Sequence, residues 1–387
     1  MTEVNVARLK TWMFDQALPL WAELGTDRIY GGCVEQLALD ASPSEAGFKR
    51  VRVTARQIYV YSHAYLMGWE PGLDIARTLY KSFVESAWLG DGIGWAKLLT
   101  PQNGVMDDTI DLYDNAFALF AMGWFYRASG ETDALRLAHA TAAIIDTKLR
   151  HPVIGFWHQV PPHGPRLQNP HMHLLEACLA CLDAFQDPLI ERLAREVIDI
   201  FQTKFFSLQT QTLCEYFDDN LAPVADDMSK IVEPGHQMEW AWILSKASQT
   251  LCIEARDTIE GLVRSGEEFG VARTGPLKGL TYNSVTTDGQ ILDGGSRTWP
   301  NTERLKAAVA LFETFGTDPR PVLNETLDAL FEKHLKHNQM GLWIDAYDSE
   351  GTPIAKAIPT STFYHIYLAF AEIVRIEPTL KAKLSRL

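Results

Sequence analysis

Long helical runs recur along the whole chain and leave little room for strands. Segments such as NAFALFAMGWFYRAS and RLKAAVALFETFG carry apolar residues at i, i+3, i+4 and i+7, which is the period of a helix. Some runs are apolar on nearly all sides, as in a helix that is buried all round, and others keep one polar face. We expect twelve helices, at residues 3–24, 52–69, 72–88, 110–129, 131–150, 169–186, 188–206, 233–250, 252–268, 300–316, 320–336 and 360–377.

Twelve helices in sequence indicate an all-α protein in which helical hairpins form a closed double ring. The chain has 387 residues, of which 47% are hydrophobic, so it can build one large domain or two ordinary ones.

A weak internal repeat places residues of chemical interest at the start of every second helix. They are spaced 57 to 66 residues apart, which is the length of one helical hairpin plus a loop. If these alternate helices form the inner ring with parallel axes, their N-termini meet at one end around a central pit. Free N–H groups and the positive ends of the helix dipoles would line that pit as well. The residues are Arg56, Tyr113, His173, His236, Trp299 and His365.

Two of these helices begin with a histidine followed by a glutamate one turn later. In GHQME, His236 and Glu239 share a helix face, so the carboxylate can hold an imidazole N–H or a sugar hydroxyl. In NPHMHLLEA, His173 is in step with Glu176, and Asn169 opens the helix. The spacing therefore predicts polar side chains that face one site.

An aromatic residue accompanies them at a third helix start, in RTWPNTERLKA. Trp299 precedes Glu303 by four residues there, and the last helix opens with STFYH before His365. Trp faces stack on the C–H faces of sugars, while carboxylates and imidazoles bind hydroxyls. Core packing explains most of the 11 Trp, but this mixture at helix starts favours a carbohydrate site.

Charge and motif content exclude several other classes of function. The net charge is −14 without a basic run, which argues against nucleic acid and anionic membranes as partners. We expect no membrane span or secretory signal, and the five scattered Cys suit reduced thiols in the cytoplasm. The histidines lack H-x-x-x-H or H-E-x-x-H spacing, and nucleotide-binding motifs are absent, so we expect neither a metal nor a cofactor.

The motifs ARQIYVYSHAY, LYDNAFALFA, NPHMHLLEA, GHQMEWAWIL, WPNTERLKA and STFYH follow the order and spacing of the N-acylglucosamine 2-epimerase superfamily. The chain resembles this family over nearly its whole length. The resemblance implies a single (α/α)6-barrel catalytic domain spanning residues 1–387, with metal-free proton transfer at C2 of a reducing sugar. It implies that His236 and His365 are the acid/base pair, with Arg56, His173 and Glu239 in support. We expect the remaining candidates to bind substrate: Tyr113, Asn169, Glu176, Trp299 and Glu303.

Two features resemble the bacterial D-mannose isomerase branch of the family. Disaccharide epimerases carry two adjacent Trp where this chain has Trp299 alone, and the STFYH that leads into His365 resembles the isomerase branch more closely. We therefore expect interconversion of D-mannose and D-fructose through an enediolate, with D-lyxose and D-xylulose as a further pair. Histidine suits this chemistry because its pKa lies near working pH.

Three alternatives stay open. The first is a sugar 2-epimerase of the mannose/glucose or N-acylglucosamine type. The second is a glycoside hydrolase that uses Glu239 and Glu303, and the third is a non-catalytic sugar-binding protein. For the isomerase or epimerase the substrate is a monosaccharide. The oligomeric state stays open, with a homodimer among the options.

Overall fold

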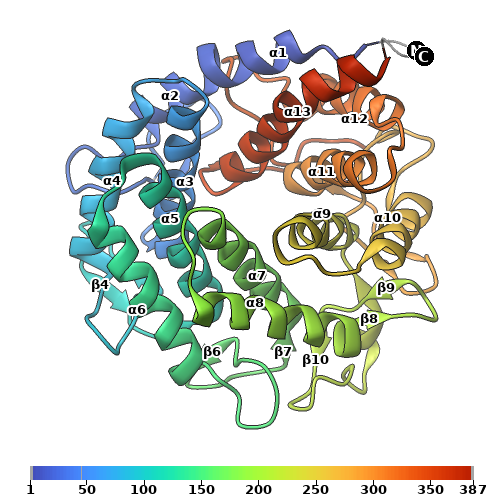
Figure 1. Cartoon of the computed structure of the whole chain (residues 1–387). Coiled ribbons are helices and arrows are strands. Elements are labelled where there is room, and N and C mark those ends of the chain that lie inside the picture. The colour runs from blue at the N-terminus through green and yellow to red at the C-terminus, as the bar shows by residue number, and fades with distance from the viewer. Residues whose placement is uncertain (1–2, 45, 385–387) are drawn as a thin grey trace.

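The helices form two concentric rings, which confirms the predicted (α/α)6 barrel (Figure 1). The computed structural model describes residues 3–44 and 46–384. Each inner helix packs against the next, and α13 packs against α3, so the inner ring is closed. The inner helices are α3 (Val51–Leu66), α5 (Leu112–Ser129), α7 (Gln168–Leu182), α9 (Pro234–Leu251), α11 (Thr298–Phe315) and α13 (Thr362–Leu384).

The outer ring is made by the other helix of each hairpin. Its first element packs against α13 and runs through residues 6–24 as α1 (Val6–Lys10), a π-helical stretch η1 (Thr11–Ala17) and α2 (Leu18–Leu24). With residues 6–24 counted as one element, all twelve predicted helices are present. The other outer helices are α4 (Gly72–Ala87), α6 (Thr132–Lys148), α8 (Pro188–Ile200), extended by the π-helical η2 (Phe201–Phe205), α10 (Arg256–Gly270) and α12 (Arg320–Glu332).

Residue patterns explain which helix takes which ring. The outer helix α8 buries Ile190, Leu193, Ala194 and Val197, which form one apolar stripe, and turns its polar face outward. The inner helix α5 buries every residue from 114 to 123, because it touches neighbours on all sides. A helix without a polar face therefore occupies the inner ring.

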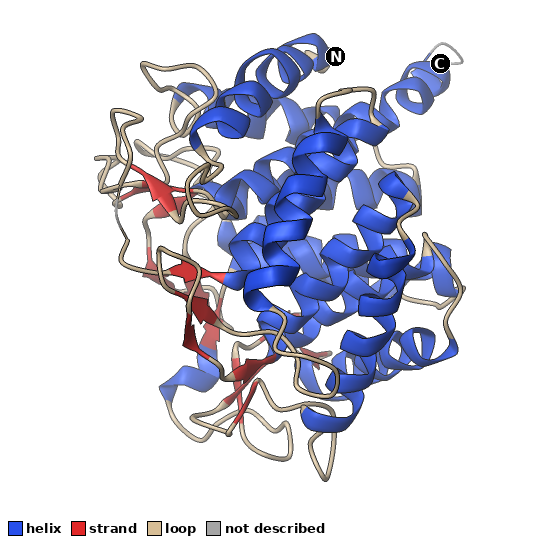
Figure 2. Ribbon diagram, turned by 90° about the vertical axis from the view of Figure 1, so that its left-hand side faces the viewer, coloured by secondary structure: helices blue, strands red, loops and turns tan. Residues whose placement is uncertain are grey.

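The strands are two or three residues long and gather at one end of the barrel (Figure 2). All pairs are antiparallel, in the orders β1–β16, β2–β3–β4, β5–β6, β7–β10, β8–β9, β11–β12–β13 and β14–β15. A strand lies directly or within two residues before every inner helix, so this end carries the inner N-termini. The strands are β1 (Gln36–Leu37), β2 (Lys49–Arg50), β3 (Leu98–Leu99), β4 (Val105–Asp107), β5 (Ile110–Asp111), β6 (Gln159–Val160), β7 (Arg166–Leu167), β8 (Phe206–Ser207), β9 (Thr212–Leu213), β10 (Tyr216–Phe217), β11 (Ile231–Val232), β12 (Ser284–Thr286), β13 (Ile291–Asp293), β14 (Ser296–Arg297), β15 (Ala346–Tyr347) and β16 (Ile358–Pro359).

Within residues 3–44 and 46–384, no helix combines the length and the apolar character that crossing a membrane requires.

Candidate active site

A pocket of about 270 Å³ opens at the N-terminal end of the inner ring. Every inner helix contributes to its wall, and all six residues of the sixty-residue repeat reach it. The lining residues on the helices are Arg56, Tyr113, Asn169, His173, His236, Glu239, Trp299, Thr362 and His365, joined by Arg50 and Arg297 from strands β2 and β14 and by Glu233 and Ser361 from loops.

The start of α9 is built to present His236 to this pocket. Pro234 is the first helical residue, where its missing N–H leaves no bond unmade. The Trp299 ring packs directly against Gly235. A Cβ at this position would lie 2.6 Å from ring atoms, so the close packing requires glycine. The PGH lead therefore packs the indole against the helix that carries His236.

The partner of His236 is Glu215 and not Glu239. Its Nδ1 lies 2.9 Å from Glu215 Oε2 and 4.0 Å from Glu233 Oε2. Burial acts to lower the pKa of His236, but the charges of Glu215 and Glu233 outweigh it and raise this pKa to about 9. The imidazole is therefore charged at neutral pH and can act as an acid.

His365 faces the same pocket in the opposite protonation state. Its Nδ1 lies 2.8 Å from Glu303 Oε1. Burial, followed by the charges of Arg56 and Lys306, lowers the pKa of His365 well below its usual value. The imidazole is therefore neutral, and Nε2 is the nitrogen that remains for the pocket. A charged and a neutral imidazole in one pocket form an acid and a base.

The indole of Trp299 lies between the two histidines. Its ring centroid is 5.0 Å from that of His236 and 5.6 Å from that of His365. Arg297 covers the indole, with 5.4 Å between its guanidinium carbon and the ring centroid. A sugar ring on this apolar surface would meet both imidazoles.

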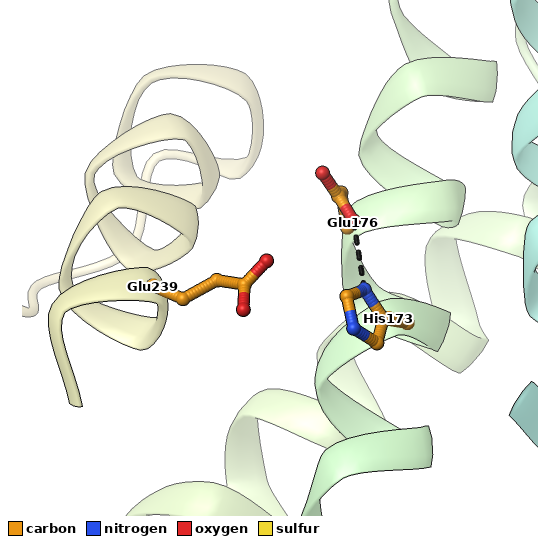
Figure 3. A group of neighbouring side chains, drawn as sticks. All are labelled: His173, Glu176 and Glu239. Carbon is orange, nitrogen blue, oxygen red and sulfur yellow. Dashed lines mark hydrogen bonds and ion pairs between the residues drawn. The ribbon is translucent and has the colours of Figure 1, made fainter. Parts of the chain in front are cut away.

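His173 and Glu176 form a third histidine–glutamate pair on α7, which Glu239 faces from α9 (Figure 3). His173 Nδ1 lies 3.0 Å from Glu176 Oε2, and the Tyr364 hydroxyl donates to the other oxygen of Glu176. Burial acts against ionisation of Glu176, but the hydrogen bond and charge of His173 lower its pKa. Glu176 lies behind His173 and does not line the pocket.

Several polar groups of the pocket are buried without a hydrogen-bond partner among the described residues. They include Arg56 Nε, Asn169 Oδ1 and both carboxylate oxygens of Glu239, which is 1% exposed. Arg56 donates to the Tyr113 hydroxyl, with an N–O distance of 2.7 Å, and it pairs with no carboxylate of residues 3–44 and 46–384. Unpaired buried polar groups are costly, so this set fits a ligand that carries several hydroxyls.

Three groups of side chains place carboxylate and imidazole atoms within 4.8 Å of one another. Glu239 belongs to two of them, and its carboxylate lies 3.8 Å from the Lys306 ammonium. Glu233 of the remaining group lies 3.0 Å from Arg297. Each group therefore already has a cation beside one of its carboxylates. The groups are His173, Glu176 and Glu239; Glu215, Glu233 and His236; and Glu239, Glu303 and His365.

Sequence reasoning missed Glu215 and Lys306. Glu215 lies in a loop 21 residues before His236, and its only signal is an acid between apolar neighbours in TLCEYF. Lys306 gave a clearer signal, because a lysine inside the apolar run RLKAAVALF of an inner helix must be buried.

The chain belongs to the N-acylglucosamine 2-epimerase (GlcNAc 2-epimerase) family, whose model matches residues 32–369. It is therefore a member of a family of sugar epimerases and isomerases. It is 30% identical over 380 residues to a mannose-6-phosphate isomerase of Rhizobium meliloti, covering 96% of this chain and 97% of the relative.

Two solved structures share the fold. The cellobiose 2-epimerase of Bacillus thermoamylovorans superposes with a TM-score of 0.86 at 19% identity, covering 96% of this chain and 98% of that chain. A D-mannose isomerase superposes with a TM-score of 0.82 at 16% identity, covering 97% of this chain and all of that chain (100%).

Proposed function

We propose that the chain is a single catalytic domain that interconverts D-mannose and D-fructose, with D-lyxose and D-xylulose as a second pair. The observation that carries the proposal is the pair of histidines across Trp299, one charged and one neutral. Proton transfer next to a carbonyl needs both forms, and histidine supplies them without a metal.

In the proposed reaction, His236 opens the sugar ring. Its imidazolium gives a proton to the ring oxygen as the ring C–O bond breaks, and it recovers one from the C1 hydroxyl. The open-chain aldose then presents C2 to His365.

His365 then removes the hydrogen on C2 and returns it to C1, while a proton moves from the C2 hydroxyl to the C1 oxygen. Negative charge grows on the oxygens of the enediolate between these steps. Arg56 and the helix N-termini would stabilise it, and one such donor is worth roughly 3 kcal/mol.

The unpaired oxygens of Glu239 and Asn169 would accept hydrogen bonds from sugar hydroxyls, and Tyr113 and His173 lie beside them in the pocket. Glu176 and Glu303 would act from behind the pocket by holding His173 and His365.

Paired charges at the rim favour a neutral sugar over a sugar phosphate. Arg50 is paired with Glu35, and Arg297 lies 3.0 Å from Glu233. A phosphate would have to displace these carboxylates, which are already bound to the arginines.

The test is incubation of the protein with D-mannose, followed by product separation at early times. Fructose as the main early product supports the isomerase, and mannose 6-phosphate in a parallel reaction should be a poor substrate. Binding of mannose without any product would contradict the proposal and favour a sugar-binding protein.

A sugar 2-epimerase is the second candidate, because His236 and His365 lie on the same indole and could act on opposite faces of C2. Glucose ahead of fructose as the early product would establish it.

The geometry does not favour a glycoside hydrolase. Such an enzyme needs two carboxylates at the scissile bond, and Glu303 is fully buried behind His365.

A further inference from the structure

Lys306 is a fully buried lysine on the inner helix α11, with 0% of its surface exposed. Its Nζ lies 2.6 Å from Glu303 Oε2 and 3.8 Å from Glu239 Oε1, and 4.2 Å from the centroid of the Trp242 ring. Lysine is almost never buried unless it is paired. Burial acts to lower the pKa of Lys306, but the charges of Glu303, Glu239 and Glu176 raise it, so the ammonium stays charged.

Lys306 does not line the pocket, and it reaches the chemistry through Glu303. One oxygen of Glu303 bonds to His365 Nδ1 at 2.8 Å, and the other holds Lys306. Two influences oppose each other at this carboxyl. Burial, followed by the charge of Glu239, raises the pKa of Glu303 well above its usual value, and the charge and contact of Lys306 oppose this increase.

The protonation of Glu303 decides which nitrogen of His365 carries the proton. An ionised Glu303 can only accept, so the neutral imidazole keeps its hydrogen on Nδ1 and leaves Nε2 free as a base. A protonated Glu303 would donate to Nδ1, and the hydrogen of the imidazole would then sit on Nε2, where it blocks the base. The two states differ by one proton on a carboxyl that the substrate does not touch.

We infer that Lys306 is a positioning residue that keeps Glu303 ionised, so that His365 presents an unprotonated Nε2 to the sugar. This inference rests on the proposed role of His365 as the base. An ion pair of 2.6 Å in a buried site favours the carboxylate strongly, because removing either partner leaves a buried charge alone.

The charged and titratable groups around the pair come from the other inner helices. Glu239 faces Lys306 from α9, Glu176 acts on it from α7, and Tyr364 and His365 come from α13. Arg56 on α3 lowers the pKa of His365 together with Lys306. On the outer side of α11, Arg304 pairs with Glu267 of α10 and Glu325 of α12.

The test is Lys306→Met, which keeps the length of the side chain and removes its charge. We expect kcat/KM for mannose to fall at least about 100-fold at neutral pH, the range of a lost general base. Activity should return as pH rises and Glu303 ionises, so the acid limb of the pH profile should move to higher pH.

The chain offers a matched control in Lys246, a lysine at the other end of the same barrel. It lies 2.9 Å from Glu313, 2.8 Å from Glu372 and 5.8 Å from the centroid of the same Trp242 ring. Lys246→Met should lower stability and leave the pH profile unchanged. Equal displacement of the profile by both variants would overturn the inference, since it would show a general structural effect.

A measurement on the native protein tests the inference even where Lys306→Met fails to fold. With ¹⁵N-labelled histidine, the nitrogen shifts of His365 report which nitrogen is protonated, and we expect Nδ1–H. Protonation at Nε2 refutes the role of Lys306 outright. If the Nδ1–H form is present but no sugar is turned over, the ionised state inferred for Glu303 stands and the proposed function fails.

Discussion

Glu215→Gln is the sharpest perturbation of the acid half of the site. The pKa of His236 is about 9 against an ordinary value of 6.5, and Glu215, 2.9 Å away, is the main source of the increase. The difference corresponds to roughly 3 kcal/mol at about 1.4 kcal/mol per pKa unit. Glu233, 4.0 Å from the imidazole, keeps part of this effect, so we expect the variant to lose most but not all of it.

The sign of the effect follows from the raised pKa. The ion pair stabilises the fold fully below pH 6.5, and this contribution is lost as pH rises through about 9. The variant should therefore be less stable than the native protein by up to about 3 kcal/mol at pH 6, with the difference shrinking by pH 10. Urea unfolding at both pH values measures it.

Activity gives an independent reading of the same pKa. If charged His236 opens the sugar ring, native kcat/KM falls only above pH about 9, and the variant should lose activity from nearer pH 7. Glu233→Gln is the control, because Glu233 is farther away and bonds to Arg297, and it should move the basic limb less. An unchanged basic limb in Glu215→Gln would refute the assignment of His236 as the acid.

Three further outcomes are expected. Arg56→Lys should lower kcat/KM about 100-fold because it loses the planar donor set. Arg52 lies one helical turn before Arg56 and is paired with Asp114, so Arg52→Lys is the control and should leave kcat/KM unchanged. Exhaustive chelation should leave activity intact, and loss that one divalent ion restores would contradict a metal-free mechanism. Gly235→Ala places a methyl 2.6 Å from the Trp299 ring, so both kcat/KM and the tryptophan fluorescence should change, and native values for both would show that the ring does not need this packing.

The fold was predictable because its elements are long and periodic. The inner helix α11, expected at 300–316, spans Thr298–Phe315, since an apolar run of this length fixes a helix to within a turn. The last helix was expected to end at residue 377, before Pro378, but it continues to Leu384 with this proline inside. Only a few of the short strands were predictable, in GVMDDTI and GLWIDAYD, because two or three residues cannot show a clear alternation.

The site was predictable only where its residues sit at helix starts. His236 and His365 follow the sixty-residue repeat, so the closure of the ring brings them to one pocket. Glu215 belongs to a loop whose path depends on pairing between β7 and β10, and such long-range contacts leave no periodic trace. The sequence therefore located both imidazoles together with Glu303 and Arg56, but it did not locate Glu215 or Lys306, which complete the control of their protonation.

Glu215 and Lys306 explain why the same histidine–glutamate pairing gives an acid at His236 and a base at His365. In both His236 and His365, Nδ1 bonds to a buried glutamate, yet the pKa values of the two imidazoles shift in opposite directions. The other bonds of Glu215 come from the Gln168 amide and the Glu233 backbone N–H, which are neutral donors, so its full negative charge acts on His236. The positive charge of Lys306 offsets the negative charge of Glu303, so burial decides the direction in which the pKa of His365 shifts. The second contact of each carboxylate, rather than the histidine itself, thus divides the pocket into an acid side and a base side.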